Sequence, residues 1–277
     1  MVSNLEPNPA SNPRVWIAVL RQSHDRLLSL VGPLSPEQIS GPSYCKDWSI
    51  AQVLSHLGSG AEIGMMMLPS ALGQSEPVDR AEFQPIWDRW NAMSPDDQAA
   101  AGLMADAQHI QMLDQLSDED LASVSYPFLG MTLDAVGLVR LRLGEHALHT
   151  WDVAVMLDPA AEVAPDAANL LIDNVAAFLA PRLGKPADPP FRARITTTEP
   201  ARDYLLSASE SVSMVDWPGT DQVGQAGADG TAIAEVTMPA EALLRLSYGR
   251  LDADHTPASV NAGPADLDRL RAIFPGF

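Results

Sequence analysis

A glutamate and a histidine four residues apart are the side chains in this sequence best placed to do chemistry. Glu145 and His149 lie in an apolar stretch that predicts a long helix. Residues four apart share one helix face, so both side chains can reach the same point. A third candidate, His56, lies between two leucines of another predicted helix. Two imidazoles and one carboxylate suit Zn²⁺, and also Fe²⁺, Mn²⁺ or Ni²⁺, and they leave coordination positions open, as a catalytic metal requires.

The spacing alone also fits a structural alternative, in which Glu145 forms an exposed ion pair and one histidine packs inside. His146 lies roughly 100° round the helix from its neighbours, so we expect it to face solvent or another helix. A set of three histidines that uses His146 in place of Glu145 is a weaker alternative. Asp152 could hold the second nitrogen of a ligand histidine, or it could form a salt bridge with Arg140 or Arg142.

The elements that must position these residues are mostly helices over the first two thirds of the chain. Apolar periodicity predicts them, and Ser49 with Gln52 fits a capping box at the start of the helix that carries His56. Thr132 is the expected N-cap of the helix that carries Glu145 and His149. The predicted helices span about 13–31, 50–72, 132–157 and 165–183, with two more between 77 and 116.

The composition changes after Gly184, where a proline-rich linker is followed by alternating, β-branched stretches. These predict strands over about 191–198, 205–209, 212–217 and 232–238, and short helices over 239–248 and 264–274. We therefore expect an α+β protein, with a helical bundle over 1–184 and a smaller α+β domain over 185–277.

The composition also excludes several classes of partner. The formal net charge is −19, which disfavours nucleic acid and anionic membrane surfaces. The single cysteine, Cys45, rules out an intrachain disulfide and a cysteine-based structural zinc site. The first residues do not read as a signal peptide and no stretch is apolar enough to span a membrane, so a cytoplasmic location is expected.

Two stretches resemble the helix signatures of the mycothiol-dependent maleylpyruvate isomerase family, within the DinB-like superfamily. They are residues 47–57 (DWSIAQVLSHL) and 142–152 (RLGEHALHTWD). Residues 23–27, the loop around Cys45, and the stretches 246–251 and 273–277 fit the family as well. One departure is Asp47, which stands where many relatives have glycine before the tryptophan.

The resemblance implies a four-helix bundle with a metal in its core, held by His56, Glu145 and His149, and a small α+β domain after it. It also implies that mycothiol, a small thiol, is the cofactor or co-substrate. Residues 73–130 match no motif of the family. They lie between the ligand-bearing helices and could shape a substrate pocket.

The expected chemistry is the addition of a metal-bound thiolate to a small electrophilic substrate, because zinc deprotonates a bound thiol. The protein is then an S-transferase or a thiol-assisted cis/trans isomerase. The alternatives are a metal-binding module without turnover and a thiol-independent metal-dependent hydrolase.

Several other side chains have expected roles in or near the same site. Arg245 and Arg250 are candidate catalytic residues that could clamp a carboxylate, with a surface ion pair as the alternative for each. Cys45 is expected to be non-catalytic, since the sequence shows no His or Asp partner near it. Trp48 and Trp151 are expected to pack in the core.

Overall fold

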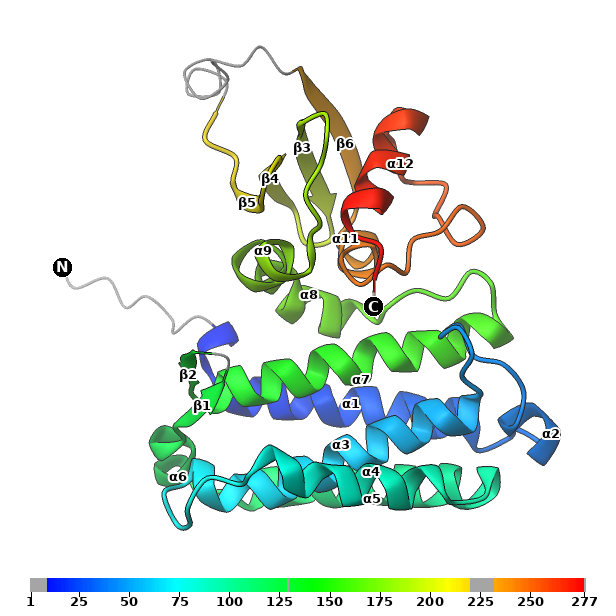
Figure 1. Ribbon diagram of the computed structural model, residues 1–277, viewed down its shortest axis with the longest axis vertical. Helices are drawn as coiled ribbons and strands as arrows, with labels where there is room; N and C mark the ends of the chain where they lie inside the picture. The colour runs from blue at the N-terminus through cyan, green and yellow to red at the C-terminus, as the bar shows by residue number, and fades with distance from the viewer. Residues whose placement is uncertain (1–8, 129, 220–231, 277) are drawn as a thin grey trace. The chain divides into compact units, whose positions relative to one another are not determined.

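The computed structural model describes residues 9–128, 130–219 and 232–276 (Figure 1). The chain divides into two compact units, Met1–Ala161 and Glu162–Phe277. The first is largely helical and the second combines a sheet with helices, so the α+β class expected from the sequence is confirmed. The residues at the N-terminus on which the signal-peptide expectation rested lie outside the described part. No helix among the described residues is both long enough and apolar enough to cross a membrane.

Four long helices form the frame of the first unit. Helix α1 contacts α7 and α5, and α3 contacts α5 and α7. The long helices are α1 (Pro13–Val31), α3 (Ile50–Ala71), α5 (Pro95–Gln115) and α7 (Ala135–Leu157). The shorter elements are η1 (Pro9–Ser11), α2 (Pro36–Ile39), η2 (Arg80–Glu82), α4 (Phe83–Asn91), α6 (Asp118–Ser123), and the antiparallel pair β1 (Tyr126–Phe128) and β2 (Met131–Leu133).

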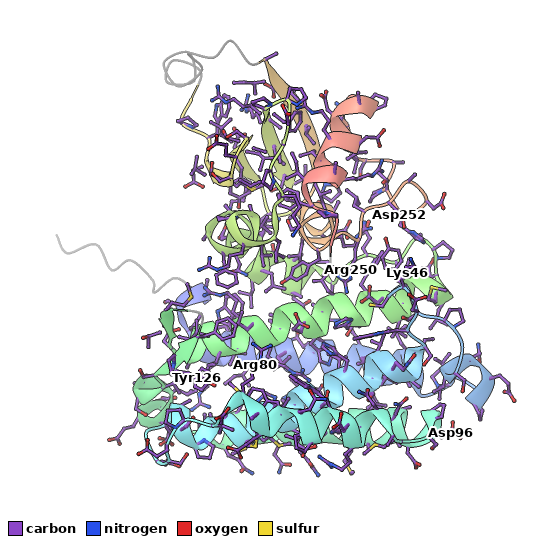
Figure 2. The ribbon with its side chains drawn as sticks, viewed as in Figure 1. Lys46, Arg80, Asp96, Tyr126, Arg250 and Asp252 are labelled. Atoms are coloured by element: carbon purple, nitrogen blue, oxygen red, sulfur yellow. The ribbon has the colours of Figure 1, made fainter. Side chains whose placement is uncertain are left out.

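Local sequence explains where these helices begin. The capping box expected for α3 forms: the Ser49 hydroxyl accepts from the Gln52 amide, and the Gln52 side chain accepts from the Ser49 amide. In α5 the first turn carries two acids, including Asp96, which complement the helix dipole (Figure 2). The cap expected for α7 was wrong. Thr132 lies in β2, and the side chain of Asp134 accepts from the Gly137 amide at 2.8 Å instead.

Helices α3 and α5 approach closely at two glycines. A Cβ atom on Gly102 would lie 2.5 Å from the Leu54 carbonyl oxygen, and one on Gly58 would lie 2.8 Å from the Gly102 Cα. Neither contact is possible without moving backbone. The close approach of the two helices therefore depends on glycine at both positions.

We predict that Gly102→Ala destabilises the protein by about 1–3 kcal/mol through overpacking, despite the gain in helix propensity of about 1 kcal/mol. Urea unfolding measures the change. Ala100→Gly, at an exposed position of the same helix, is the control that measures the propensity difference alone. An alanine variant at 102 that is more stable than wild type would show that the helices can move apart at no cost.

The second unit is built on a four-stranded sheet with strand order β5-β4-β3-β6. Strand β4 pairs antiparallel with β3 and β5, whereas β6 runs parallel to β3. The strands are β3 (Phe191–Thr198), β4 (Arg202–Ala208), β5 (Val212–Asp216) and β6 (Ile233–Pro239), and the helices are α8 (Pro165–Asn174), the π-helical turn η3 (Val175–Leu179), α9 (Ala180–Leu183), α11 (Ala240–Ser247) and α12 (Pro264–Ile273).

The two units divide at residue 161, before the boundary at 184/185 expected from composition. Helix α8 contacts α11, and α9 contacts β5, so both helices belong with the sheet. Apolar periodicity predicts that a segment is helical, but it does not say which neighbours the helix packs against. The helices over 165–183 were for that reason expected in the wrong unit.

Candidate metal centre

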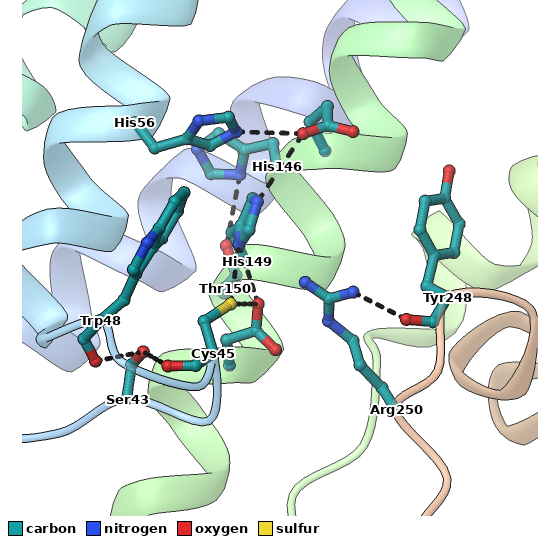
Figure 3. Close-up of polar contacts among 11 residues, drawn as sticks. Ser43, Cys45, Trp48, His56, His146, His149, Thr150, Tyr248 and Arg250 are labelled. Atoms are coloured by element: carbon teal, nitrogen blue, oxygen red, sulfur yellow. Dashed lines mark hydrogen bonds and ion pairs between the residues drawn. The ribbon is translucent and has the colours of Figure 1, made fainter. Parts of the chain in front are cut away.

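Helices α3 and α7 bring the three predicted ligands together, and Figure 3 labels two of them, His56 and His149. His56 Nε2 lies 3.1 Å from Glu145 Oε2, and His149 Nε2 lies 3.7 Å from the same oxygen. One donor atom from each residue falls within 4.8 Å of the others. The i, i+4 spacing in α7 places Glu145 and His149 on one face, and α3 supplies His56 from the facing helix.

The electrostatics of this group fit a divalent cation. Desolvation raises the pKa of the Glu145 carboxyl. Hydrogen bonds from His149 and His56 outweigh this effect and lower the pKa below its ordinary value. The carboxylate is therefore anionic at neutral pH. No Lys or Arg is among the described contacts of the three side chains, so a positive ion would meet no fixed cation there.

The state of His149 determines how such an ion must bind. Burial lowers the pKa of His149, but hydrogen bonds with Asp152, Cys45 and Glu145 raise it to about 10. In the metal-free protein this imidazole is therefore protonated at neutral pH. A metal at Nε2 must displace that proton.

We accordingly predict that zinc binding to metal-free protein at pH 8 releases about one proton from His149. Since the pKa is raised, the proton competes with zinc at every pH below about 10, and the apparent zinc affinity falls as the pH is lowered. Calorimetric titration in buffers of different ionisation enthalpy measures the release. The Asp152→Asn variant should release less. A binding enthalpy that does not depend on the buffer would contradict the prediction.

Asp152 holds the other nitrogen of His149. Its Oδ2 lies 2.8 Å from His149 Nδ1, the contact that metal-bound imidazoles commonly make. Of the two arginines considered as alternative partners, Arg142 binds Asp106. The contact fixes which nitrogen of His149 faces Glu145.

Cys45 also belongs to this group, contrary to expectation. Its thiol donates to Asp152 Oδ2 at 3.0 Å, and its Sγ lies 3.7 Å from His149 Nδ1. The expectation that Cys45 lacks a His or Asp partner was wrong. The loop before α3 folds back onto α7, and the Tyr44 amide donates to the Asp152 carbonyl at 3.0 Å. About a hundred residues separate the partners, and an irregular loop carries no periodicity that could reveal the contact.

Trp48 lies over the candidate ligands instead of in the core. Its side chain is 37% exposed, so the expectation of core packing was wrong for Trp48, whereas Trp151 is buried as expected. The Trp48 indole stacks on the His149 ring at 6.1 Å between centroids and tilts over His56 at 5.3 Å. It therefore covers one side of the candidate metal position.

A pocket of about 390 Å³ opens beside His56. Two of its residues, Trp87 and Asn91, come from α4, inside the segment 73–130 that matches no family motif. The pocket offers two indole faces, two amides and two hydroxyls beside the imidazole. Its lining consists of Trp48, Gln52, Ser55, His56, Ser59, Trp87 and Asn91.

A second group of possible ligands lies in the bundle core, where Asp106 accepts from His24 Nδ1 and His146 Nε2, each at 2.8 Å. Burial raises the pKa of the Asp106 carboxyl, but His146 and Arg142 outweigh this and hold it well below its usual range. Arg142 lies 2.5 Å from the carboxylate, so a cation already compensates this charge. A metal does not fit here, and His146, which is fully buried, faces other helices and not the candidate metal position.

Sequence reasoning missed Asp106. The residue lies in a helix with many polar and small side chains, and only its place on the buried face of α5 distinguishes it from exposed neighbours. That face becomes recognisable only once the partners of α5 are known.

The two candidate catalytic arginines lie in the second unit. Arg245 is 1% exposed and pairs with Glu241 through two hydrogen bonds of 2.7 and 2.9 Å, and it donates to the His255 carbonyl. The pair is buried and is therefore not the surface pair considered as the alternative, and the catalytic role of Arg245 stays a prediction. Arg250 donates to the Tyr248 carbonyl at 3.1 Å, and its catalytic role stays a prediction.

Comparison with known proteins identifies a similar family and similar folds. Residues 20–154 match the family model described as the mycothiol maleylpyruvate isomerase N-terminal domain. The crystal structure of a mycothiol-dependent maleylpyruvate isomerase is similar over 91% of this chain and 93% of that chain, with a TM-score of 0.64 and 12% identity. A histidine-to-alanine mutant of such an isomerase gives the same values. At this identity the likeness shows the fold.

A further solved structure is similar over a smaller part of the chain. It is YfiT from Bacillus subtilis, described as a probable metal-dependent hydrolase with an unusual four-helix bundle topology. It is 17% identical and covers 55% of this chain and 91% of its own, with a TM-score of 0.39. No curated protein matches the sequence.

Proposed function

We propose that this protein is a cytoplasmic metalloenzyme that uses mycothiol, and the match of residues 20–154 to the mycothiol maleylpyruvate isomerase N-terminal domain model supports the proposal. The observation that carries the proposal is the convergence of His56, Glu145 and His149 beside an open pocket. The metal is zinc or another divalent ion, since the same two-imidazole, one-carboxylate set suits several.

When bound, the metal would lower the pKa of a coordinated thiol and polarise a substrate carbonyl. The residues of the chain orient the ligands and shield them from water. Asp152 orients His149 by its hydrogen bond to Nδ1. The Trp48 indole shields one side of the ligands from water, and the pocket beside His56 receives the remainder of the bound molecules.

The reaction that follows is the addition of the thiolate to a small electrophile. If the adduct rotates about a former double bond and expels the thiol, the protein is an isomerase. If the sulfur is kept, it is an S-transferase. Both begin with the same carbon–sulfur bond, so the mass of the product distinguishes them.

The test uses zinc-loaded protein with maleylpyruvate or a simple aromatic electrophile, with and without mycothiol. We expect turnover only when the thiol is present, and product mass spectrometry then assigns isomerisation or S-transfer. Turnover without thiol would replace the proposal with a metal-dependent hydrolase. Tight zinc binding without turnover on either substrate would favour a metal-binding module.

A further inference from the structure

The guanidinium of Arg142 joins the two helices that carry the candidate metal ligands. Its Nη2 donates to the Leu57 carbonyl at 2.8 Å and to Asp106 Oδ1 at 2.5 Å. Leu57 directly follows His56 in α3, and Arg142 lies one turn before Glu145 in α7. One side chain thus connects α7 to the backbone beside His56, and Asp106 of α5 holds that side chain in place.

Arg142 has little freedom to move. Its side chain is 10% exposed and that of Asp106 is 2% exposed. The second oxygen of Asp106 is bound by His24 and His146, so the carboxylate is fixed from several helices. Gly60 leaves the space that the guanidinium fills, because a Cβ atom there would lie 3.0 Å from Arg142 Nη1.

His56 depends on this connection more than His149 does. The Nδ1 atom of His149 is held by Asp152. Among the described residues, the His56 ring makes its polar contact through Nε2, with Glu145, and the ring otherwise packs against Trp48 and His149. Its position relative to α7 is therefore set mainly by where α3 lies.

We propose that Arg142, held by Asp106, is a positioning residue that sets His56 at the right distance from Glu145 and His149 for a metal ion. The inference rests on the proposed metal site. A purely structural ion pair would change the stability of the bundle but not the zinc affinity of the folded protein. A positioning residue must change the zinc affinity and the geometry of the bound ion.

The first test is Arg142→Lys, which keeps the positive charge but replaces the planar guanidinium group by a single ammonium group. We expect a folded protein whose zinc dissociation constant is about 10- to 100-fold higher, and whose Co²⁺ form has shifted d–d absorption bands. Arg140→Lys, on the same helix, is the matched control and should bind zinc as wild type does.

The second test is Gly60→Ala, which keeps the proposal testable if the Arg142→Lys variant does not fold. The added methyl group meets only the Arg142 guanidinium, and alanine favours the helix, so folding is retained. We expect weaker zinc binding without loss of stability. Zinc affinity and cobalt spectra equal to wild type in Gly60→Ala, or in folded Arg142→Lys, would overturn the positioning role alone. A wild-type protein that binds no zinc would overturn the metal site itself.

Discussion

Replacing Asp106 by alanine is expected to destabilise the protein by about 3–5 kcal/mol, the usual cost of breaking a buried ion pair from one side. The substitution leaves the Arg142 cation buried without its carboxylate. It also removes the partner of two imidazoles in the bundle core. Urea unfolding of the metal-free protein, monitored by circular dichroism, gives the change in the free energy of unfolding.

The pH dependence of stability tests the same interaction. Because the folded-state pKa of Asp106 lies well below its ordinary value, its contribution is fully present above the unfolded pKa of about 3.9. It is lost as the pH falls below that value towards the folded pKa. The Asp106→Ala variant should therefore lose less stability than wild type over this acid range.

Asp118→Ala is the matched control. Asp118 forms an ion pair with Arg14 at 2.8 Å, but its side chain is 91% exposed. Its loss is expected to cost no more than about 1 kcal/mol. Equal costs at the two positions would show that the buried network contributes no more than a surface pair.

Replacing Glu145 by glutamine is expected to weaken zinc binding by at least about 100-fold, because loss of a mere outer contact of a metal ligand already costs about 10- to 100-fold. The substitution keeps the size of the side chain and removes the negative charge that two imidazoles share. Thiol-dependent turnover should fall in proportion to the fraction of protein left without metal. Competition with a chromophoric chelator measures the affinity.

Glu119→Gln supplies the control for that experiment. Glu119 is exposed in the first turn of α6. The candidate ligands lie in two other helices, α3 and α7. It should leave both zinc affinity and turnover unchanged. A Glu145→Gln protein that holds zinc as tightly as wild type would remove this residue from the set of ligands.

The sequence predicted the parts of the site that follow from local rules. Glu145 and His149 share a helix face because of their spacing, and the capping box of Ser49 and Gln52 is complete within four residues. His56 could be proposed because it interrupts an apolar stretch. Each of these inferences needs only one helix and its period.

The parts that the sequence could not predict depend on packing between distant segments. The contact of Cys45 with Asp152 requires a loop to fold back onto α7. The place of Asp106 depends on three helices meeting in one core. Trp48 was expected inside because it is large and apolar, yet an indole beside open metal ligands can remain exposed.

The most direct test of the account is anomalous diffraction at the zinc edge from crystals of the zinc-loaded protein. We predict one peak, within about 2.0–2.2 Å of His56 Nε2, His149 Nε2 and a carboxylate oxygen of Glu145. A peak between Cys45 and Asp152, a peak at Asp106 in the bundle core, or folded protein that takes up no zinc would contradict it.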